Sequence, residues 1–234
     1  MEDKRTNWIS NNQTPSLDNL IVDKIKDQLE EKMQASAMDV NVFCKDGYVH
    51  LSGIVDVLAE KIKSEDIARS IDGVRKIENK ITIAMDSNIT DKHMEKEISS
   101  RLRKDHTLDG VSPKVNDGVS NLIGSAPTLR DAKEACRLAS KTRGIKDVVN
   151  NIKIESYGKY DDSIISSRVA QALTTTDLSL MDIDHRVQDG KLTLSGYVNN
   201  RQEVELAKEL SMEVEGVRKV VNRLKIRRDN QRQI

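Results

Sequence analysis

The stretch DGYVHLSGIV, residues 46–55, reads as a tight turn followed by a β-strand, and near copies of it occur twice more in the chain. They are DGVSNLIGSA from Asp117 and DGKLTLSGYV from Asp189. Around them, glycines and asparagines recur 71 and then 72 residues apart, which is the signature of a tandem repeat. When the three copies are aligned, four positions, or repeat columns, hold the same residue: Gly47, Gly118 and Gly190; Gly53, Gly124 and Gly196; Gly73, Gly144 and Gly216; and Asn79, Asn150 and Asn222.

The repeat predicts three domains of about equal size. They are expected at 16–85, 88–156 and 159–228, with a flexible N-terminus at 1–15 and a C-terminal tail at 229–234. Each unit opens with apolar residues at helical spacing after an acidic candidate for the helix cap. The apolar residues are Ile21, Ile25, Leu29 and Met33 in the first unit, Met94, Ile98 and Leu102 in the second, and Ile164, Ile165, Val169 and Leu173 in the third.

A hairpin follows the first helix. Asp-Gly is a strong signal for a type I′ turn, since both central residues of that turn need a positive φ. The next glycine, Gly53 in the first unit, lies where the second strand ends or bends and where a side chain could obstruct packing. Pro113 removes a backbone donor from the first strand of the middle unit, so that strand is expected at a sheet edge.

A second helix follows, in which small residues recur one turn apart. They are Ser64, Ala135 and Ala207, and then Ala68, Ala139 and Ser211. Small side chains let a helix approach a sheet closely, and the third glycine of each unit is expected to end this helix as the C′ residue in the left-handed conformation. With a last strand, the sequence predicts an α+β fold: three tandem αββαβ units, each a small three-stranded mixed sheet with both helices on one face.

The composition limits the classes of partner. The chain of 234 residues has 38 Lys plus Arg and 38 Asp plus Glu, so no global field favours nucleic acid or an anionic membrane. The N-terminus has no apolar run of the length that a secretory signal needs, and the rest has no transmembrane span. We expect a cytoplasmic protein as sequenced, or a periplasmic one if the chain is a processed form. Cys44 and Cys136 occupy non-equivalent repeat positions, which predicts neither a disulfide framework nor a metal cluster.

The LSG at the end of the hairpin, the Ala-rich second helix, and the GV or GI and Asn before the final strand resemble the BON domain, named for bacterial osmotic-shock and nodulation proteins. The resemblance covers all three units. It implies the αββαβ fold, no known catalytic activity, and roles in osmotic and other stress responses and in association with phospholipid or the cell envelope. It also implies potassium sensing in some members.

The absence of known catalytic motifs supports the non-enzymatic interpretation. The sequence contains no HExxH, CxxC, GxSxG or GxxxxGK[ST] motif, and its four histidines share no repeat column. We therefore predict a binding or scaffold protein without a catalytic site, a metal site or an obligatory cofactor. The alternative is a cytosolic potassium-binding sensor, in which backbone carbonyls at the glycine turns would supply hard oxygen ligands.

Charge by unit suggests where an anionic partner would bind. Between Ile89 and Ser156 there are thirteen basic and ten acidic residues, whereas the two signs balance in the third unit. The predicted lipid-binding residues of the middle unit lie near two helix ends, where they also suit the helix dipole. They are Arg101, Arg103, Lys104, Lys141, Arg143 and Lys146.

Two apolar residues of the middle unit are predicted to form an interface. Val119 and Ile123 alternate with Leu122 and so lie on the opposite face of their strand. Packing between units, a homo-oligomer contact and membrane contact are the three interpretations of such a patch. The expected partner of the whole protein is an anionic phospholipid surface or an envelope protein.

Overall fold

The computed structural model describes residues 16–33, 39–85, 88–156, 158–174 and 182–227. The chain divides into two compact units, 1–84 and 85–234. The first unit holds one copy of the repeat and the second holds two. The terminal segments expected at 1–15 and 229–234 lie outside the described residues.

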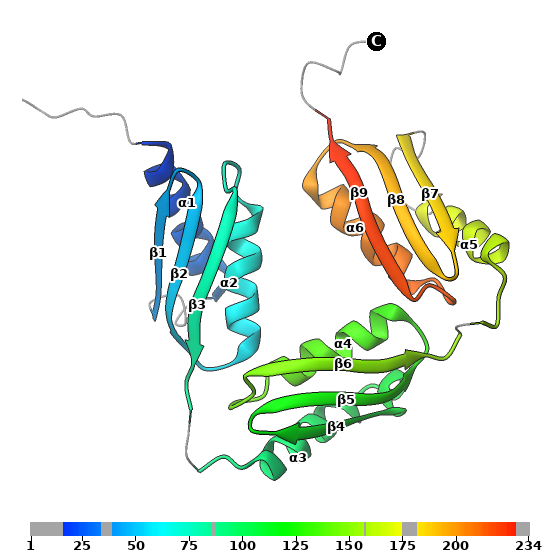
Figure 1. The fold of residues 1–234 in the computed structure, drawn as a ribbon, viewed down its shortest axis with the longest axis horizontal. Coiled ribbons are helices and arrows are strands. Elements are labelled where there is room, and N and C mark those ends of the chain that lie inside the picture. The colour runs from blue at the N-terminus through cyan, green and yellow to red at the C-terminus, as the bar shows by residue number, and fades with distance from the viewer. Residues whose placement is uncertain (1–15, 34–38, 86–87, 157, 175–181, 228–234) are drawn as a thin grey trace, which may run out of the picture. The chain divides into compact units, whose positions relative to one another are not determined.

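The first repeat consists of two helices and a three-stranded sheet (Figure 1). Strand β1 pairs antiparallel with β2, and β2 pairs parallel with β3, so the order β1-β2-β3 makes a mixed sheet. The elements are α1 Leu17–Met33, β1 Val40–Lys45, β2 Tyr48–Val55, α2 Leu58–Ser70 and β3 Lys76–Ile83.

The second and third repeats have the same order of elements and the same pairing. Strand β4, which contains Pro113, lies at a sheet edge as predicted. The second repeat comprises α3 Asp91–Leu102, the short 3-10 helix η2 His106–Leu108, β4 Val111–Asn116, β5 Val119–Ala126, α4 Leu129–Ser140 and β6 Asp147–Ile154. The third comprises α5 Asp162–Thr174, β7 Ile183–Gln188, β8 Lys191–Val198, α6 Arg201–Glu213 and β9 Lys219–Ile226.

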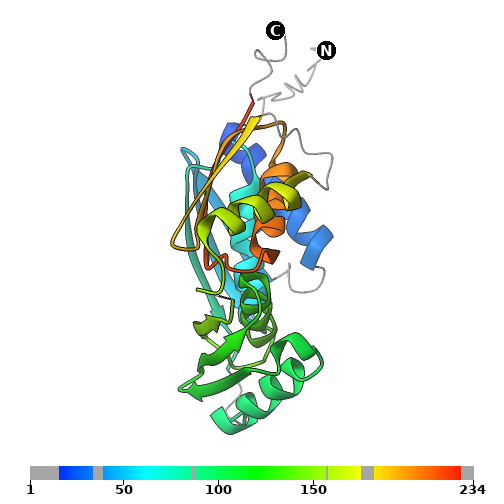
Figure 2. The ribbon, with the colours of Figure 1, turned by 90° about the vertical axis from the view of Figure 1, so that its right-hand side faces the viewer.

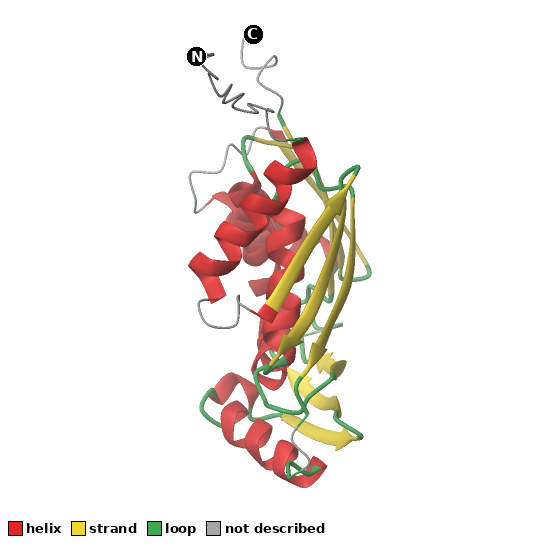
Figure 3. Cartoon of the chain, turned by 90° about the vertical axis from the view of Figure 1, so that its left-hand side faces the viewer, coloured by secondary structure: helices red, strands yellow, loops and turns green. Residues whose placement is uncertain are grey.

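In each repeat both helices cover one face of the sheet and leave the other face open, which Figure 2 and Figure 3 show from the side. The core lies between these two layers. The six small helix residues are fully buried in it: Ser64, Ala68, Ala135, Ala139, Ala207 and Ser211. The predicted α+β fold is confirmed.

Two local predictions need correction. Ile164 is 45% exposed, because Ile165, Val169 and Leu173 already form the buried stripe four residues apart and Ile164 points away from it. The third glycines do have a positive φ, but each lies beyond the C′ position. Helix α2 ends at Ser70 with its cap at Ile71, so Gly73 shapes the loop into β3 and does not directly end the helix.

Candidate binding surfaces

An aspartate at the start of the first helix holds the hairpin turn in every repeat. In the first, one carboxylate oxygen of Asp18 accepts from the backbone N–H of Asp46 at 2.8 Å and the other from that of Gly47 at 3.0 Å. The turn has φ values of 52° and 76°, as the predicted type I′ turn requires. Asp91 makes the same pair of bonds to Asp117 and Gly118, and Asp162 to Asp189 and Gly190.

The sequence indicated these aspartates only as helix caps. In α3 the cap is Thr90, whose side chain accepts from the backbone N–H of His93, while Asp91 in the first turn reaches the hairpin. The recurring Asp-Gly pair therefore fits a structural role in all three repeats, and the carboxylate fixes the sheet relative to the helix layer.

Acidification tests this contact in the first repeat. The bond from Gly47, followed by that from Asp46, lowers the pKa of Asp18 below its ordinary value of 3.8. A lowered folded-state pKa contributes stability that is complete above the unfolded value and is lost as the pH falls through the folded value. The thermal midpoint of the first unit should therefore drop below about pH 4, and Asp18→Asn should flatten that drop. The control is Asp27→Asn on the exposed side of α1, which should show the same drop in thermal midpoint as the wild type. An unchanged pH profile in Asp18→Asn would contradict this role.

The structure separates the six predicted lipid-binding residues into two groups. Arg101, Arg103 and Lys104 lie at the C-terminal end of α3, and Arg101 pairs with Glu97 at 2.7 Å. The other three flank Gly144, which lies against Met94 in the first turn of α3. A helix of 12 residues is about 18 Å long, so the groups lie at opposite ends of the repeat. They do not form one continuous patch.

Val119 and Ile123 lie on the open face of the middle sheet, opposite buried Leu122, as predicted. Ile123 is 44% exposed, and Val119 is partly buried. Their parallel partners on β6 are Asp147 and Asn151. This face is close to neutral, and a hydrogen bond of 2.9 Å joins Asn151 to Asn121 across it.

The open sheet faces of the three repeats differ in their side-chain chemistry. The turn glycines, the aspartate that holds the turn and the small helix residues are shared, because the fold needs them. At matched positions of the open face, Phe43 corresponds to Lys114 and Arg186, and Tyr48 corresponds to Val119 and Lys191. The first sheet thus presents aromatic side chains, the second a neutral face and the third a cationic one.

The open face of the third sheet carries five basic side chains, all exposed, which we call the basic face. They are Arg186 on β7, Lys191 on β8, and Lys219, Arg223 and Lys225 on β9. Lys191 is the parallel partner of Lys219, and Lys225 is that of the half-exposed Tyr197. Asp184 is the one acidic residue on this face of the described strands. Among the residues that the structure describes, none of the five forms an ion pair.

The sequence analysis missed the basic face because it compared only the net charge of each whole repeat. In the net charge of the third repeat, acidic residues elsewhere, among them Glu203, Glu205, Glu209 and Glu213 on α6, offset the basic residues of the sheet. Alternation along β9, from Lys219 through Val221 and Arg223 to Lys225, is the signal that would have revealed a charged face.

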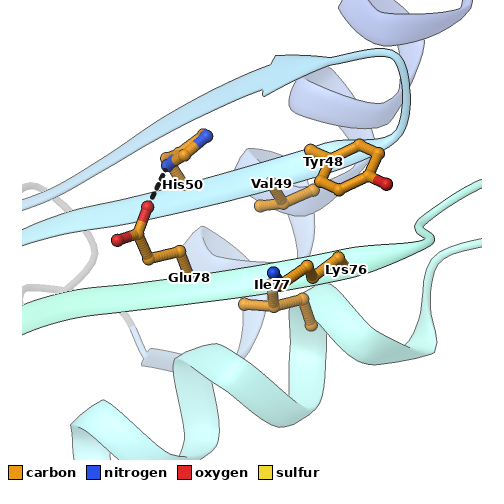
Figure 4. A pocket seen from close by; sticks show the side chains of 6 residues that line it. All are labelled: Tyr48, Val49, His50, Lys76, Ile77 and Glu78. Carbon is orange, nitrogen blue, oxygen red and sulfur yellow. Dashed lines mark ion pairs between the residues drawn. The ribbon is translucent and has the colours of Figure 1, made fainter.

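A pocket of about 250 Å³ lies on the open face of the first sheet (Figure 4). Tyr48 and His50 of β2 and Lys76 and Glu78 of β3 line it. His50 Nδ1 lies 2.7 Å from Glu78, and Lys80 reaches the other carboxylate oxygen at 2.9 Å. These bonds lower the pKa of Glu78, chiefly through Lys80. The one carboxylate of this pocket is already paired.

The second and third repeats contact each other through α4 and α6. Arg130 pairs with Glu213, and the buried backbone N–H of Gly216 donates to Ser156 Oγ at 2.7 Å. Leu129 packs against the core of the third repeat. Burial, followed by repulsion from Lys208 on α6, lowers the pKa of Lys133. Residues 85–234 therefore form one unit in which these helix surfaces are occupied.

The chain belongs to the BON domain family, whose model matches residues 18–85, 90–156 and 161–228. The three matched segments coincide with the three repeats. Among its relatives is Osmotically-inducible protein Y of Escherichia coli K12, 26% identical over 144 residues, or 58% of this chain and 72% of that protein. Another is the 21 kDa hemolysin of Actinobacillus pleuropneumoniae, 24% identical over 143 residues, or 58% of this chain and 73% of that protein.

Solved structures give only a loose likeness. The C-terminal domain of CdsD, a structural protein of the type III secretion system of Chlamydia trachomatis, is 17% identical with a TM-score of 0.26. The match covers 92% of this chain and all of that one. A TM-score this low does not indicate a shared overall structure.

Within the described residues, no helix combines the length and apolarity needed to cross a membrane. Nor do three or more His, Cys, Asp or Glu side chains gather there as metal ligands.

Proposed function

We propose that this BON-domain protein is a non-enzymatic, stress-related binding protein that associates with anionic phospholipid surfaces through the basic face of its third domain. The observation that carries the proposal is the gathering of five exposed cationic side chains on one open sheet face. Four acidic residues of the same domain, Glu203, Glu205, Glu209 and Glu213, lie in its other layer, on α6.

The geometry of the basic face suits a surface more than a small ligand. Neighbouring strands lie about 4.8 Å apart and alternate residues about 6.6 Å apart, so the five charges spread over a nearly flat area. A compact ligand would require the charges to converge on one point, and they do not. A bilayer presents many phosphate groups over an area of this kind.

The expected affinity is modest. Each basic residue held near an anionic bilayer contributes about 1 kcal/mol, so five could contribute about 5 kcal/mol, which corresponds to a dissociation constant near the millimolar range. Such binding is reversible and sensitive to salt, because ions screen charges within about 3 Å at 1 M. A protein that binds in this way would respond to the lipid composition and to the ionic strength around it.

Flotation of the full chain with vesicles tests the proposal. Vesicles of phosphatidylcholine alone should bind the protein only weakly at low salt, whereas vesicles that also contain phosphatidylglycerol should carry it upward. Most of this binding should be lost at about 1 M salt. Failure to float with phosphatidylglycerol at low salt would overturn the proposal.

A further inference from the structure

The open face of the first sheet exposes three large apolar side chains, which we call the aromatic face. Phe43 on β1 is 60% exposed, and Tyr48 and Ile54 on β2 are 47% and 58% exposed. Phe43 lies directly across from His50, with ring centroids 6.1 Å apart, and Tyr48 is the next outward residue along β2. The two aromatic rings thus lie near the turn end of the sheet, and Ile54 lies farther along β2.

Lysines flank Tyr48 on both neighbouring strands. Lys45 is the strand partner of Tyr48 on one side, and Lys76 is its partner on the other. The one acidic residue of this described face, Glu78, is held by His50 and Lys80. Tyr48 therefore lies between two lysines, Phe43 lies on the same face beside His50, and the one carboxylate nearby is already paired.

We propose that the aromatic face is a second membrane-docking surface, at which Phe43 and Tyr48 enter the interfacial layer of an anionic bilayer while Lys45 and Lys76 contact its headgroups. This inference rests on the proposed function, since both faces bind the same lipid. It adds an apolar contribution, which screening by salt does not remove.

The residue types favour a bilayer over a protein partner. Aromatic residues are common at both kinds of surface, but lysine is depleted at protein–protein interfaces. Lysines at a membrane surface extend their charged ends toward the headgroups while the alkyl chains stay in the apolar layer. Tyrosine is enriched at the same depth because it has an apolar ring and a polar end.

Binding at high salt tests this contribution. The double variant Phe43→Ser, Tyr48→Ser should lower the binding that remains at about 1 M salt by about tenfold, because that remainder depends on buried apolar area. The control is Ile62→Ser, which removes an apolar side chain that is 47% exposed on α2, in the helix layer. The control should bind as the wild type does. Thermal unfolding of both variants establishes that the first domain is folded.

A fluorescent probe at position 43 reports insertion directly. The chain has one tryptophan, Trp8, so Trp8→Phe with Phe43→Trp places a single probe on the aromatic face. On phosphatidylglycerol vesicles its emission should shift to the blue, and lipids brominated near the headgroup should quench it. A probe that stays solvent-exposed on bound protein would overturn the inference.

The two proposals fail in different ways. If the wild type binds at low salt and the double variant matches it at every salt concentration, the aromatic face does not bind lipid but the basic face still does. If the wild type never binds, both proposals fail. If the double substitution abolishes self-association, measured by sedimentation, but leaves vesicle binding unchanged, the aromatic face contacts a second copy of the chain and the inference is wrong.

Discussion

Replacing Gly53 with alanine is expected to unfold the first domain and to leave residues 85–234 folded. An added Cβ would lie 1.8 Å from the carbonyl oxygen of Asp39, and Gly53 has a φ of 136°. Neither the strand nor the backbone it meets can move without breaking the pairing of β1 with β2. The combined strain should exceed about 3 kcal/mol, a large fraction of the stability of so small a domain.

Gly158→Ala provides the matched control. Gly158 also has a positive φ, of 80°, but among the described residues, its chain neighbours apart, nothing lies within 4 Å of an added Cβ. This substitution should cost only the left-handed backbone penalty of about 1–2 kcal/mol. Hydrogen exchange distinguishes the two, since Gly53→Ala should remove protection from the helices and strands of residues 17–83 alone. Wild-type protection there would show that the repeat does not depend on close contact at this glycine.

Charge reversal on the basic face is the second prediction with a large effect. In Lys191→Glu, Lys219→Glu, Arg223→Glu, three cationic side chains are lost and three anionic ones are gained on one sheet face. Loss of the three attractions alone costs about 3 kcal/mol, or about a hundredfold in the vesicle partition coefficient at low salt. Repulsion between the three introduced glutamates and the anionic lipids should lower the partition coefficient further. Because all three side chains are exposed, thermal stability should change little.

The sequence predicted the fold well because its strongest signals are local. A glycine six residues beyond an Asp-Gly turn, or an alanine one helical turn from a serine, reports a backbone conformation or a close approach that the residue types themselves require. The three copies in register also show which positions the fold demands. Asp18 was misjudged because a carboxylate at the start of a helix looks the same in sequence whether it caps that helix or reaches a hairpin 28 residues away.

The binding surfaces were harder to predict because they depend on which strands become neighbours. Arg101 and Lys146 belong to one short unit with excess positive charge, but the path of the chain places them at opposite ends of α3. Arg186 and Arg223 come from distant segments, and pairing through β8 places them on one face. A net charge summed over each repeat shows neither the separation of the first pair nor the gathering of the second. The chemistry of the faces therefore follows from the strand order β7-β8-β9, which the sequence did not settle.

The most direct test of the account compares two triple variants of the full chain in one vesicle-binding assay. One is the basic-face variant, and the other is Arg101→Glu, Arg103→Glu, Lys104→Glu, which changes the net charge by the same amount in the second domain. With phosphatidylglycerol vesicles at low salt, the account predicts that the basic-face variant loses binding and the second-domain variant largely keeps it. Retained binding in the basic-face variant, with loss in the other, would contradict the central claim.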